Sequence, residues 1–312
     1  MSFTKTSILL LLGAAFGLAS CSFDPDQARL ASEARALEGQ AQGLYNASYA
    51  AEQAGKTSSA IKGYKKINRL YPMSPVAAES QYRVSRLLQS EGDLLKAFDS
   101  YDNFLKNYPA SSHYADAMKQ QEIIAHNVAN GQIKNSFLGL KSRIEAKRTA
   151  EMLTKVRNNA PRSASAEKAQ FTIGSVYKSR KNPEKAIEAF RTLTRDYPLS
   201  KYAPEAQYQI GVLLLDEAKE GNQDAANLDR ARNAFEDLLI RHPNSTRAAD
   251  AKRQIAKLAS GDIQRSYEIA EFYRKKGQTK SALLYYKEVL RAAKPGPLRS
   301  KAQAKISELG SQ

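Results

Sequence analysis

A residue followed by proline returns at intervals along the 312-residue chain, and this repetition constrains the fold more than any other feature. Successive prolines are 37, 52, 37, 45 and 52 residues apart, so a 37-residue unit carries insertions of about 15, 8 and 15 residues. The pairs are Tyr71-Pro72, Tyr108-Pro109, Ala160-Pro161, Tyr197-Pro198 and His242-Pro243, with a looser copy at Pro295. Periods of this length are typical of stacked helical hairpins.

Three further positions recur in register with the first five prolines. The residue twelve positions earlier is small: Ala60, Ala97, Thr149, Ala186 and Ala231. The residue eight positions earlier is large and apolar: Tyr64, Tyr101, Leu153, Phe190 and Phe235. Thirteen positions after the proline come small or polar residues, among them Ser85, Gly174, Gly211 and Ala256.

These offsets resemble the tetratricopeptide repeat, in which a small residue lies where helix A crosses helix B and the proline ends helix B. The unit at 170–198 is the best example, since Gly174 and Ala186 let two backbones approach and Phe190 fills the remaining volume. An ordinary helical bundle also has small and aromatic residues at helical spacing, but five copies in one register favour the repeat. We predict an all-α, right-handed tetratricopeptide solenoid of about five to six hairpins. The turns between helices A and B are expected at Gly55, Gly92 and Gly277.

The composition agrees with this fold and limits the partners. Trp is absent and continuous period-2 apolar runs are missing, so strands are not expected. The formal charge is +16, or +15 if Lys5 leaves with an N-terminal signal peptide. In an exported protein, this excess favours acidic protein surfaces, lipid headgroups or phosphorylated glycolipid as partners, and no nucleic acid.

The N-terminus has the anatomy of a secretory signal. Lys5 provides the positive region, residues 8–12 the apolar region and residues 13–20 the small residues before a cleavage site. The only cysteine follows at once, and Leu18-Ala19-Ser20-Cys21 resembles the lipobox of bacterial lipoproteins, which implies a lipidated Cys21. An ordinary signal followed by an idle cysteine is the alternative. Ser22, where an aspartate would retain the protein in the inner membrane, favours the periplasmic face of the outer membrane.

The domain boundaries follow from the signal, the repeats and the charge. We expect a signal peptide at 1–20, the lipidated cysteine and a polar, partly helical spacer at 21–40, and an N-terminal repeat region at 41–130. A basic insertion and helix follow at 131–163, and a C-terminal repeat region at 164–312.

No arrangement of residues suggests catalysis. The three histidines are far apart, and no carboxylate or thiol joins them at metal-ligand spacing. His242 takes the place of the tyrosine in the repeat, whereas His113 and His126 are expected at the surface or in a groove. No phosphate loop, nucleophile triad or catalytic carboxylate pair can be singled out. We therefore expect no enzyme activity, no catalytic residue, no metal and no cofactor.

Longer motifs resemble the BamD family of outer-membrane lipoproteins in the β-barrel assembly machinery. They are the link Tyr71-Pro-Met-Ser-Pro-Val76, the inserted segment Asn135-Ser-Phe-Leu-Gly-Leu-Lys-Ser142, and Tyr267-Glu-Ile-Ala-Glu-Phe-Tyr273 followed by Gly277 and Ala282. The resemblance runs from 18 to about 290, with motifs of modest specificity. An additional hairpin around 164–220 and a single final helix depart from the family, so the N-terminal half carries more of the resemblance.

The resemblance implies a peptide-binding groove in the first two repeats. That groove would receive the C-terminal signal of unfolded outer-membrane proteins, which has an aromatic end and a free carboxylate. The candidate residues on helices A are Tyr45, Tyr49, Gln53, Gln81, Arg83, Arg86 and Gln89. Arg83 and Arg86 are candidates to bind the carboxylate.

The segment 131–181 has the most unusual local charge, with twelve Lys or Arg against three Glu. A solvated face is the plain interpretation. A docking surface for an acidic partner domain or anionic headgroups is the sharper one. Its candidate residues are Lys141, Arg143, Lys147, Arg148, Lys155 and Arg157.

Two functions follow. The first is a non-enzymatic outer-membrane scaffold that binds substrate signals in its N-terminal groove and a BamA-like barrel-forming subunit through its C-terminal repeats. The alternative is a generic periplasmic tetratricopeptide lipoprotein that organises cell-envelope or peptidoglycan complexes.

Overall fold

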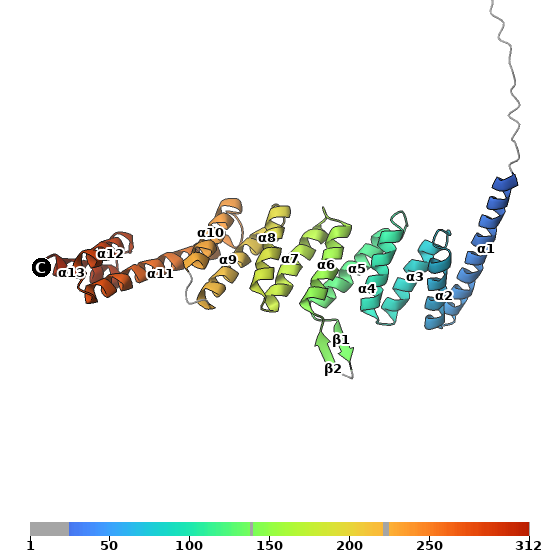
Figure 1. Ribbon diagram of the computed structural model, residues 1–312, viewed down its shortest axis with the longest axis horizontal. Coiled ribbons are helices and arrows are strands. Elements are labelled where there is room, and N and C mark those ends of the chain that lie inside the picture. The colour runs from blue at the N-terminus through green and yellow to red at the C-terminus, as the bar shows by residue number, and fades with distance from the viewer. Residues whose placement is uncertain (1–24, 138–139, 221–224, 312) are drawn as a thin grey trace, which may run out of the picture. The chain divides into compact units, whose positions relative to one another are not determined.

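A computed structural model describes residues 25–137, 140–220 and 225–311 as helical hairpins (Figure 1). Helices A are α1 (Pro25–Gln53), α3 (Ala77–Ser90), α5 (Tyr114–Ala129), α7 (Ala164–Ser179), α9 (Ala203–Glu220) and α11 (Ala248–Lys275). Helices B are α2 (Thr57–Leu70), α4 (Leu94–Asn107), α6 (Ala146–Asn159), α8 (Pro183–Asp196), α10 (Ala225–Arg241) and α12 (Thr279–Ala292), and α13 (Pro297–Gly310) follows. The predicted class, a helical tetratricopeptide solenoid, is confirmed.

The chain divides into two compact units, Met1–Leu87 and Leu88–Gln312. In the first unit α1 packs on α2. In the second, the hairpins α5–α6, α7–α8, α9–α10 and α11–α12 form, and each packs on the next through helices that follow one another in the chain. Helix α1 is continuous from Pro25, so residues 25–40 of the expected spacer are helical throughout.

The hairpins are held by the residues whose offsets repeat. Each small residue twelve positions before a proline is buried, and so is each large residue eight positions before it. At Gly174 an added Cβ would lie 2.5 Å from the Phe190 ring, and at Gly211 it would lie 2.5 Å from the Phe235 ring. A third close approach, where a Cβ on Gly63 would overlap the Ser48 hydroxyl, was not predicted. Ala256, at the corresponding position of the last copy, is exposed.

The links between hairpins share a backbone turn that the proline pattern only partly indicates. A serine lies two residues after each of the first five prolines, and its N–H donates to the carbonyl of the residue before the proline. The N···O distance is 3.0 Å for Ser74, Ser200 and Ser245 and 3.1 Å for Ser111 and Ser163. Each serine thus closes a tight turn that leads into the next helix A.

Glycines make most of the turns inside the hairpins, as predicted. Gly55, Gly92 and Gly277 have φ angles of 69°, 79° and 72°, which place them in the left-handed region. In the α7–α8 turn the same conformation falls on Lys181, with φ of 55°, the one such non-glycine residue in the described chain. A side chain there is strained, because its Cβ crowds the backbone.

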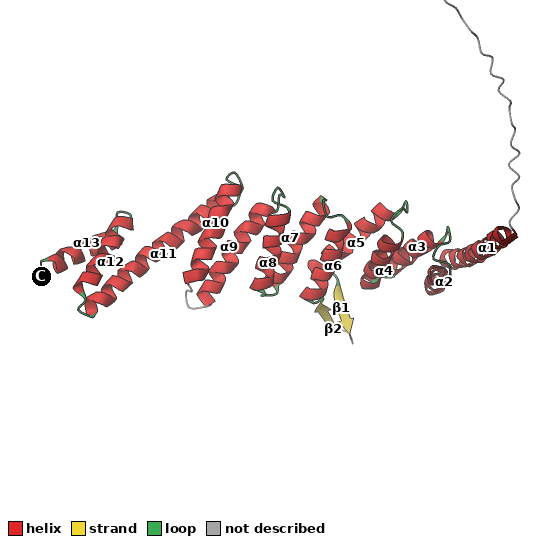
Figure 2. Ribbon diagram, turned by 45° about the horizontal axis from the view of Figure 1, so that its top comes forward, coloured by secondary structure: helices red, strands yellow, loops and turns green. Residues whose placement is uncertain are grey.

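The first and the last insertion are accommodated differently. The first contains a two-stranded antiparallel ribbon, β1 (Lys134–Phe137) and β2 (Leu140–Arg143), between α5 and α6 (Figure 2). The expectation of no strands was therefore wrong here, because a ribbon of two short strands needs no alternating apolar run. The last insertion lengthens α11 to 28 residues. Its first half packs in one core with α10 through Ala251, and its second half in another core with α12 through Ala270.

The structure describes His126 but not the N-terminal signal. His126 is 7% exposed, so its predicted place at the surface or in a groove was wrong. The signal peptide and Cys21 lie outside the described residues and stay predictions. Among the residues that are described, no helix is both long enough and apolar enough to cross a membrane.

Candidate functional site

Five side chains of α1, α2 and α3 form a cluster in the first unit, which we call the Tyr–Arg cluster: Tyr45, Tyr49, Glu52, Tyr64 and Arg83. The rings of Tyr45 and Tyr49 stack with centroids 6.3 Å apart, as expected of residues four apart on one helix. The Arg83 guanidinium lies 4.9 Å from the centre of the Tyr49 ring, within cation–π range. Tyr49 remains 41% exposed, so the cluster presents an aromatic surface to solvent.

Glu52 is the hub of the cluster. Its carboxylate accepts a hydrogen bond from the buried Tyr64 hydroxyl at 2.7 Å and from Arg83 Nη1 at 3.1 Å. Burial, followed by the hydrogen bond to Glu52, raises the pKa of Tyr64. Burial alone would lower the pKa of Arg83, but Tyr45 and Glu52 outweigh it and raise that pKa. The network therefore keeps Arg83 charged and Tyr64 protonated.

Arg83 is less suited to binding a ligand carboxylate than its sequence position indicates. Its Nε lies 2.7 Å from Glu79 Oε1 and donates to the Tyr45 hydroxyl at 3.1 Å, in addition to the contact with Glu52. Two carboxylates thus already surround this guanidinium. Arg83 positions Tyr45 and Tyr49 rather than offering an open charge.

The other predicted groove residues are placed differently from one another. Arg86 follows Arg83 by three residues on α3, so it lies on the same side of that helix, and it is exposed; its Nη1 donates to the Tyr82 hydroxyl at 3.1 Å. Gln53 is exposed and Gln81 half-buried. Gln89 belongs to the second unit, where it accepts from the Tyr101 hydroxyl at 2.7 Å and donates to Gln120 at 2.9 Å. Gln89 therefore links α3 to both α4 and α5 within the fold.

Glu52 and Gln89 occupy equivalent positions in their hairpins, which the proline offsets do not indicate. Each lies twelve residues before the tyrosine of its helix B and accepts a hydrogen bond from that tyrosine's hydroxyl, Tyr64 in one hairpin and Tyr101 in the other. Where the equivalent aromatic residue is Phe190, the position twelve residues earlier is Lys178, which instead donates to Gln209. An acceptor thus occurs where a buried hydroxyl requires one.

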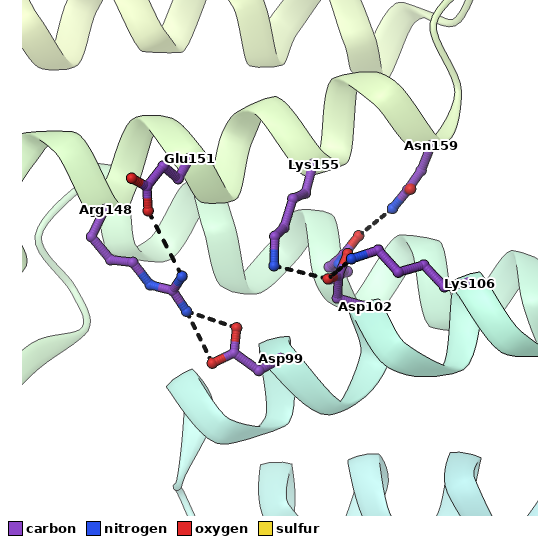
Figure 3. Close-up of polar contacts among 8 residues, drawn as sticks. Asp99, Asp102, Lys106, Arg148, Glu151, Lys155 and Asn159 are labelled. Atoms are coloured by element: carbon purple, nitrogen blue, oxygen red, sulfur yellow. Dashed lines mark hydrogen bonds and ion pairs between the residues drawn. The ribbon is translucent and has the colours of Figure 1, made fainter.

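The basic segment contains a second group of candidates, and half of them are engaged within the fold. Figure 3 shows two of these, Arg148 and Lys155. Arg148 of α6 donates through Nη2 to both oxygens of Asp99 on α4, at 2.7 and 2.9 Å. Lys155 lies 2.8 Å from the carboxylate of the buried Asp102, which Lys106 also approaches to 2.7 Å. Burial would raise the pKa of Asp102, but the hydrogen bonds from the two lysines hold it below its ordinary value.

These contacts fasten the B helices of neighbouring hairpins to each other. Asn159 of α6 adds a hydrogen bond to the Gln121 side chain of α5 at 2.7 Å. Arg157 donates to Gln170 of α7 at 2.6 Å. Arg148, Lys155 and Arg157 therefore stabilise the stack. Arg143 and Lys147 are exposed, and the Lys141 side chain lies outside the described part of the structure.

No chemistry of the catalytic kind emerges from the titratable groups in the parts of the chain that are described. No group of three or more His, Cys, Asp or Glu residues there could hold a metal ion. His126 has a strongly lowered pKa, but it is enclosed by packing.

Comparison with known proteins decides the family. The YfiO family, described as outer membrane lipoprotein, matches residues 37–130 and 140–302, which is well over half of the chain. The chain belongs to this family. The match includes the Tyr–Arg cluster, and it excludes both the segment before residue 37 and β1 of the ribbon.

Named relatives of this YfiO-family chain carry one description. Outer membrane protein assembly factor BamD of Neisseria gonorrhoeae is 29% identical over 127 residues, which are 38% of this chain and 48% of that protein. BamD of Neisseria meningitidis serogroup B gives the same values. The YfiO-family chain thus spans about half the length of the curated relatives it matches.

A solved structure gives a weaker likeness. A thermophilic tetratricopeptide protein of Thermus thermophilus is 15% identical, with a TM-score of 0.30; the match covers 70% of the YfiO-family chain and 98% of that structure. The assignment of the fold rests on the hairpins themselves.

Proposed function

We propose that this chain is a non-enzymatic lipoprotein scaffold of the β-barrel assembly machinery. Its membership of a family of outer membrane lipoproteins supports the location, and the name of its Neisseria relatives supports the assembly role. Helical hairpin stacks act by binding other polypeptides along their exposed helices. The contribution of the chain is thus to hold substrate and machinery together.

The anchor in this proposal is a lipidated Cys21 at the periplasmic face of the outer membrane. The lipobox motif supports it, because a diacylated or triacylated cysteine gives far more stable attachment than a single chain. Helix α1 begins only four residues after Cys21, so little chain separates the anchor from the first hairpin.

The Tyr–Arg cluster is the proposed receptor for the C-terminal signal of unfolded outer-membrane proteins, and its exposed aromatic surface is the observation that carries this function. The aromatic end of the signal packs on Tyr49, and its free carboxylate binds the exposed Arg86. Arg83 holds the tyrosines in place while its own charge is compensated by Glu52 and Glu79.

Binding of a fluorescein-labelled signal peptide with a C-terminal Phe tests this. The free-acid peptide is expected to bind better than its C-terminal amide, and Arg86→Glu should remove that difference and weaken binding about tenfold. Arg69→Glu, on the exposed end of α2, makes the same charge change away from the cluster and should leave binding unchanged. Equal binding by wild type and Arg86→Glu would contradict the proposed receptor.

We propose that the barrel-forming subunit binds the C-terminal repeats. A generic organiser of envelope or peptidoglycan complexes remains the second candidate, and the identity of the proteins that co-purify with the chain separates the two.

A further inference from the structure

In the second unit, successive B helices border grooves whose floor is the A helix between them. The floor between α6 and α8 is made by Gln170, Ile173 and Tyr177 of α7, and the floor between α8 and α10 by Gln207, Ile210 and Leu214 of α9. These triplets are 37 residues apart, the length of one repeat unit. The glutamine of each triplet makes an equivalent hydrogen bond to the following helix B: Gln170 donates to the Ala189 carbonyl and Gln207 to the Ala234 carbonyl.

The corresponding position between α4 and α6 is bridged by the chain's own side chains. Asp99 pairs with Arg148, and Asp102 with Lys155, across the two B helices (Figure 3). The α8–α10 groove has an acid and a base at the positions equivalent to Asp99 and Arg148, Glu188 and Arg230, yet no ion pair within 4.0 Å joins them among the described residues. Ion pairs thus close the position between α4 and α6, whereas the groove between α8 and α10 is open.

The α8–α10 groove is strongly cationic at one end. A cavity of about 600 Å³ there is lined by four arginines, Arg191, Arg195, Arg230 and Arg241. Asp237 is the one carboxylate in its lining. Arg195 pairs with Asp196, and Arg230 donates to Asn227. Arg191 and Arg241 are exposed, and within the described residues neither has a carboxylate in ion-pair range.

The adjoining part of the groove has mixed charge. A second cavity of about 480 Å³ shares Arg191, Arg195 and Arg230 but is also lined by Glu184, Glu188 and Glu217. The cationic end lies toward Pro198 and Arg241, at the C-terminal ends of α8 and α10. Two exposed apolar side chains adjoin these lining residues in sequence, Leu199 at 99% and Ile240 at 76% exposure.

We propose that the groove between α8 and α10 docks an extended, acidic segment of a partner protein. Carboxylates of the segment bind Arg191 and Arg241, whose planar guanidinium groups suit bidentate recognition of such groups. Apolar side chains of the segment contact the exposed Leu199 and Ile240. The three glutamates of the adjoining cavity would repel an anionic membrane, whereas a polypeptide can place its acidic residues at one end only.

The site is separate from the Tyr–Arg cluster, so its test is separate. The full mature chain is titrated into a fluorescein-labelled peptide of repeated Glu-Leu-Ser, with repeated Lys-Leu-Ser as the charge-reversed probe. The acidic probe is expected to bind and the basic probe not to. The double variant Arg191→Glu, Arg241→Glu should weaken binding of the acidic probe at least about tenfold. Both positions are exposed, so circular dichroism should show the wild-type thermal unfolding profile.

A matched control separates the groove from net charge. Lys280→Glu with Lys287→Glu makes the same change of charge at exposed positions of α12 and should leave binding within about twofold of wild type. The Arg86→Glu variant should also bind the acidic probe normally, which separates this site from the signal receptor. Equal weakening by the α12 control would overturn the proposal. So would loss of binding to phosphatidylglycerol vesicles in the Arg191/Arg241 variant without any loss of peptide binding.

Discussion

Gly174 of helix A and Phe190 of helix B pack directly against each other in the α7–α8 hairpin. The ring comes within 2.5 Å of where a Cβ on Gly174 would lie, so the ring and the backbone are complementary at this point. Gly211 and Phe235 repeat the arrangement one hairpin later. Close packing of this kind makes a one-carbon change costly, because neighbouring atoms must move.

Gly174→Ala is therefore expected to destabilise the α7–α8 hairpin by about 1–3 kcal/mol, despite the better helix propensity of alanine. Gly261→Ala, in the middle of α11 with nothing within 4 Å of the added Cβ, should instead stabilise by about 1 kcal/mol. Urea unfolding followed by circular dichroism measures both. Stabilisation by Gly174→Ala would contradict the packing described.

His126 is a second residue whose environment fixes its chemistry. Burial first, and then the charge of Lys168 on α7, lower the pKa of His126 to about 4, although Glu122 on its own helix acts in the opposite direction. Glu122 Oε1 lies 3.8 Å from His126 Nε2, and Thr172 of α7 lies 3.5 Å from Nδ1. The imidazole is thus neutral in the folded protein at neutral pH.

This lowered pKa predicts acid sensitivity. Between pH 6.5 and about 4 the unfolded chain binds a proton at residue 126 that the folded chain does not. The free energy of unfolding therefore decreases as the pH is lowered through this range. The loss approaches about 1.4 kcal/mol per pH unit in that window. His126→Gln should remove this part of the dependence, as measured by urea unfolding at about pH 7.5, 5.5 and 4.5. An unchanged slope in the variant would show that His126 is not responsible.

At the scale of the hairpin, the turn between helices A and B requires a left-handed residue. Gly92 supplies it in the second hairpin at φ of 79°, whereas Lys181 is forced into it in the fourth at φ of 55°. Asn182 and Pro183 then start α8, since the Asn182 side chain caps it and Pro183 needs no N–H there.

Lys181→Gly should therefore raise the free energy of unfolding by about 1 kcal/mol, because it removes the strain of a Cβ in the left-handed region. Gly92→Ala is the reciprocal change and should lower it by a similar amount, since nothing lies within 4 Å of the added Cβ and only backbone strain changes. Thermal unfolding of both variants checks the pair. A destabilised Lys181→Gly would mean that the lysine side chain contributes more than its strain costs.

The B helices of neighbouring hairpins are joined at Asp102, which is 3% exposed and paired with Lys106 and Lys155. Asp102→Asn should destabilise the second unit by about 2 kcal/mol at neutral pH. Because the pKa of Asp102 is lowered from 3.8, its contribution is present above that pH and is lost as pH falls through the lower folded value. Asp99→Asn, at a half-exposed pair, should cost less than about 1 kcal/mol. Equal effects of the two changes, measured by urea unfolding, would contradict the role of burial.

For the whole molecule, sequence reasoning succeeded where the contact lies inside one repeat. The sequence located Ala186, Phe190 and Gly174 because each position recurs at a fixed offset from a proline. The Asp99–Arg148 and Asp102–Lys155 pairs span 49 and 53 residues across an insertion, so no period indicates them. The sequence left a solvated face and a docking surface as the two interpretations of the basic segment, whereas half of its candidates pair within the stack.

The binding surfaces were harder still to locate from sequence. Arg83 and Arg86 look equivalent on one helix face, and the positions of Glu52 and Glu79 are what make Arg83 a structural guanidinium, while Arg86 is exposed. The arginines between α8 and α10 come from two hairpins and converge only in the folded chain. Stacked hairpins thus have a predictable core and a surface that depends on how neighbouring repeats meet.

Affinity purification of the full chain from detergent-solubilised envelopes most directly tests whether it is an assembly scaffold of the outer membrane. We expect a barrel-forming protein with periplasmic domains to co-purify, and Cys21→Ser to move the chain from the membrane to the soluble periplasmic fraction. Recovery of peptidoglycan synthases in place of a barrel-forming protein, with the wild-type chain already soluble, would contradict both the assembly role and the anchor.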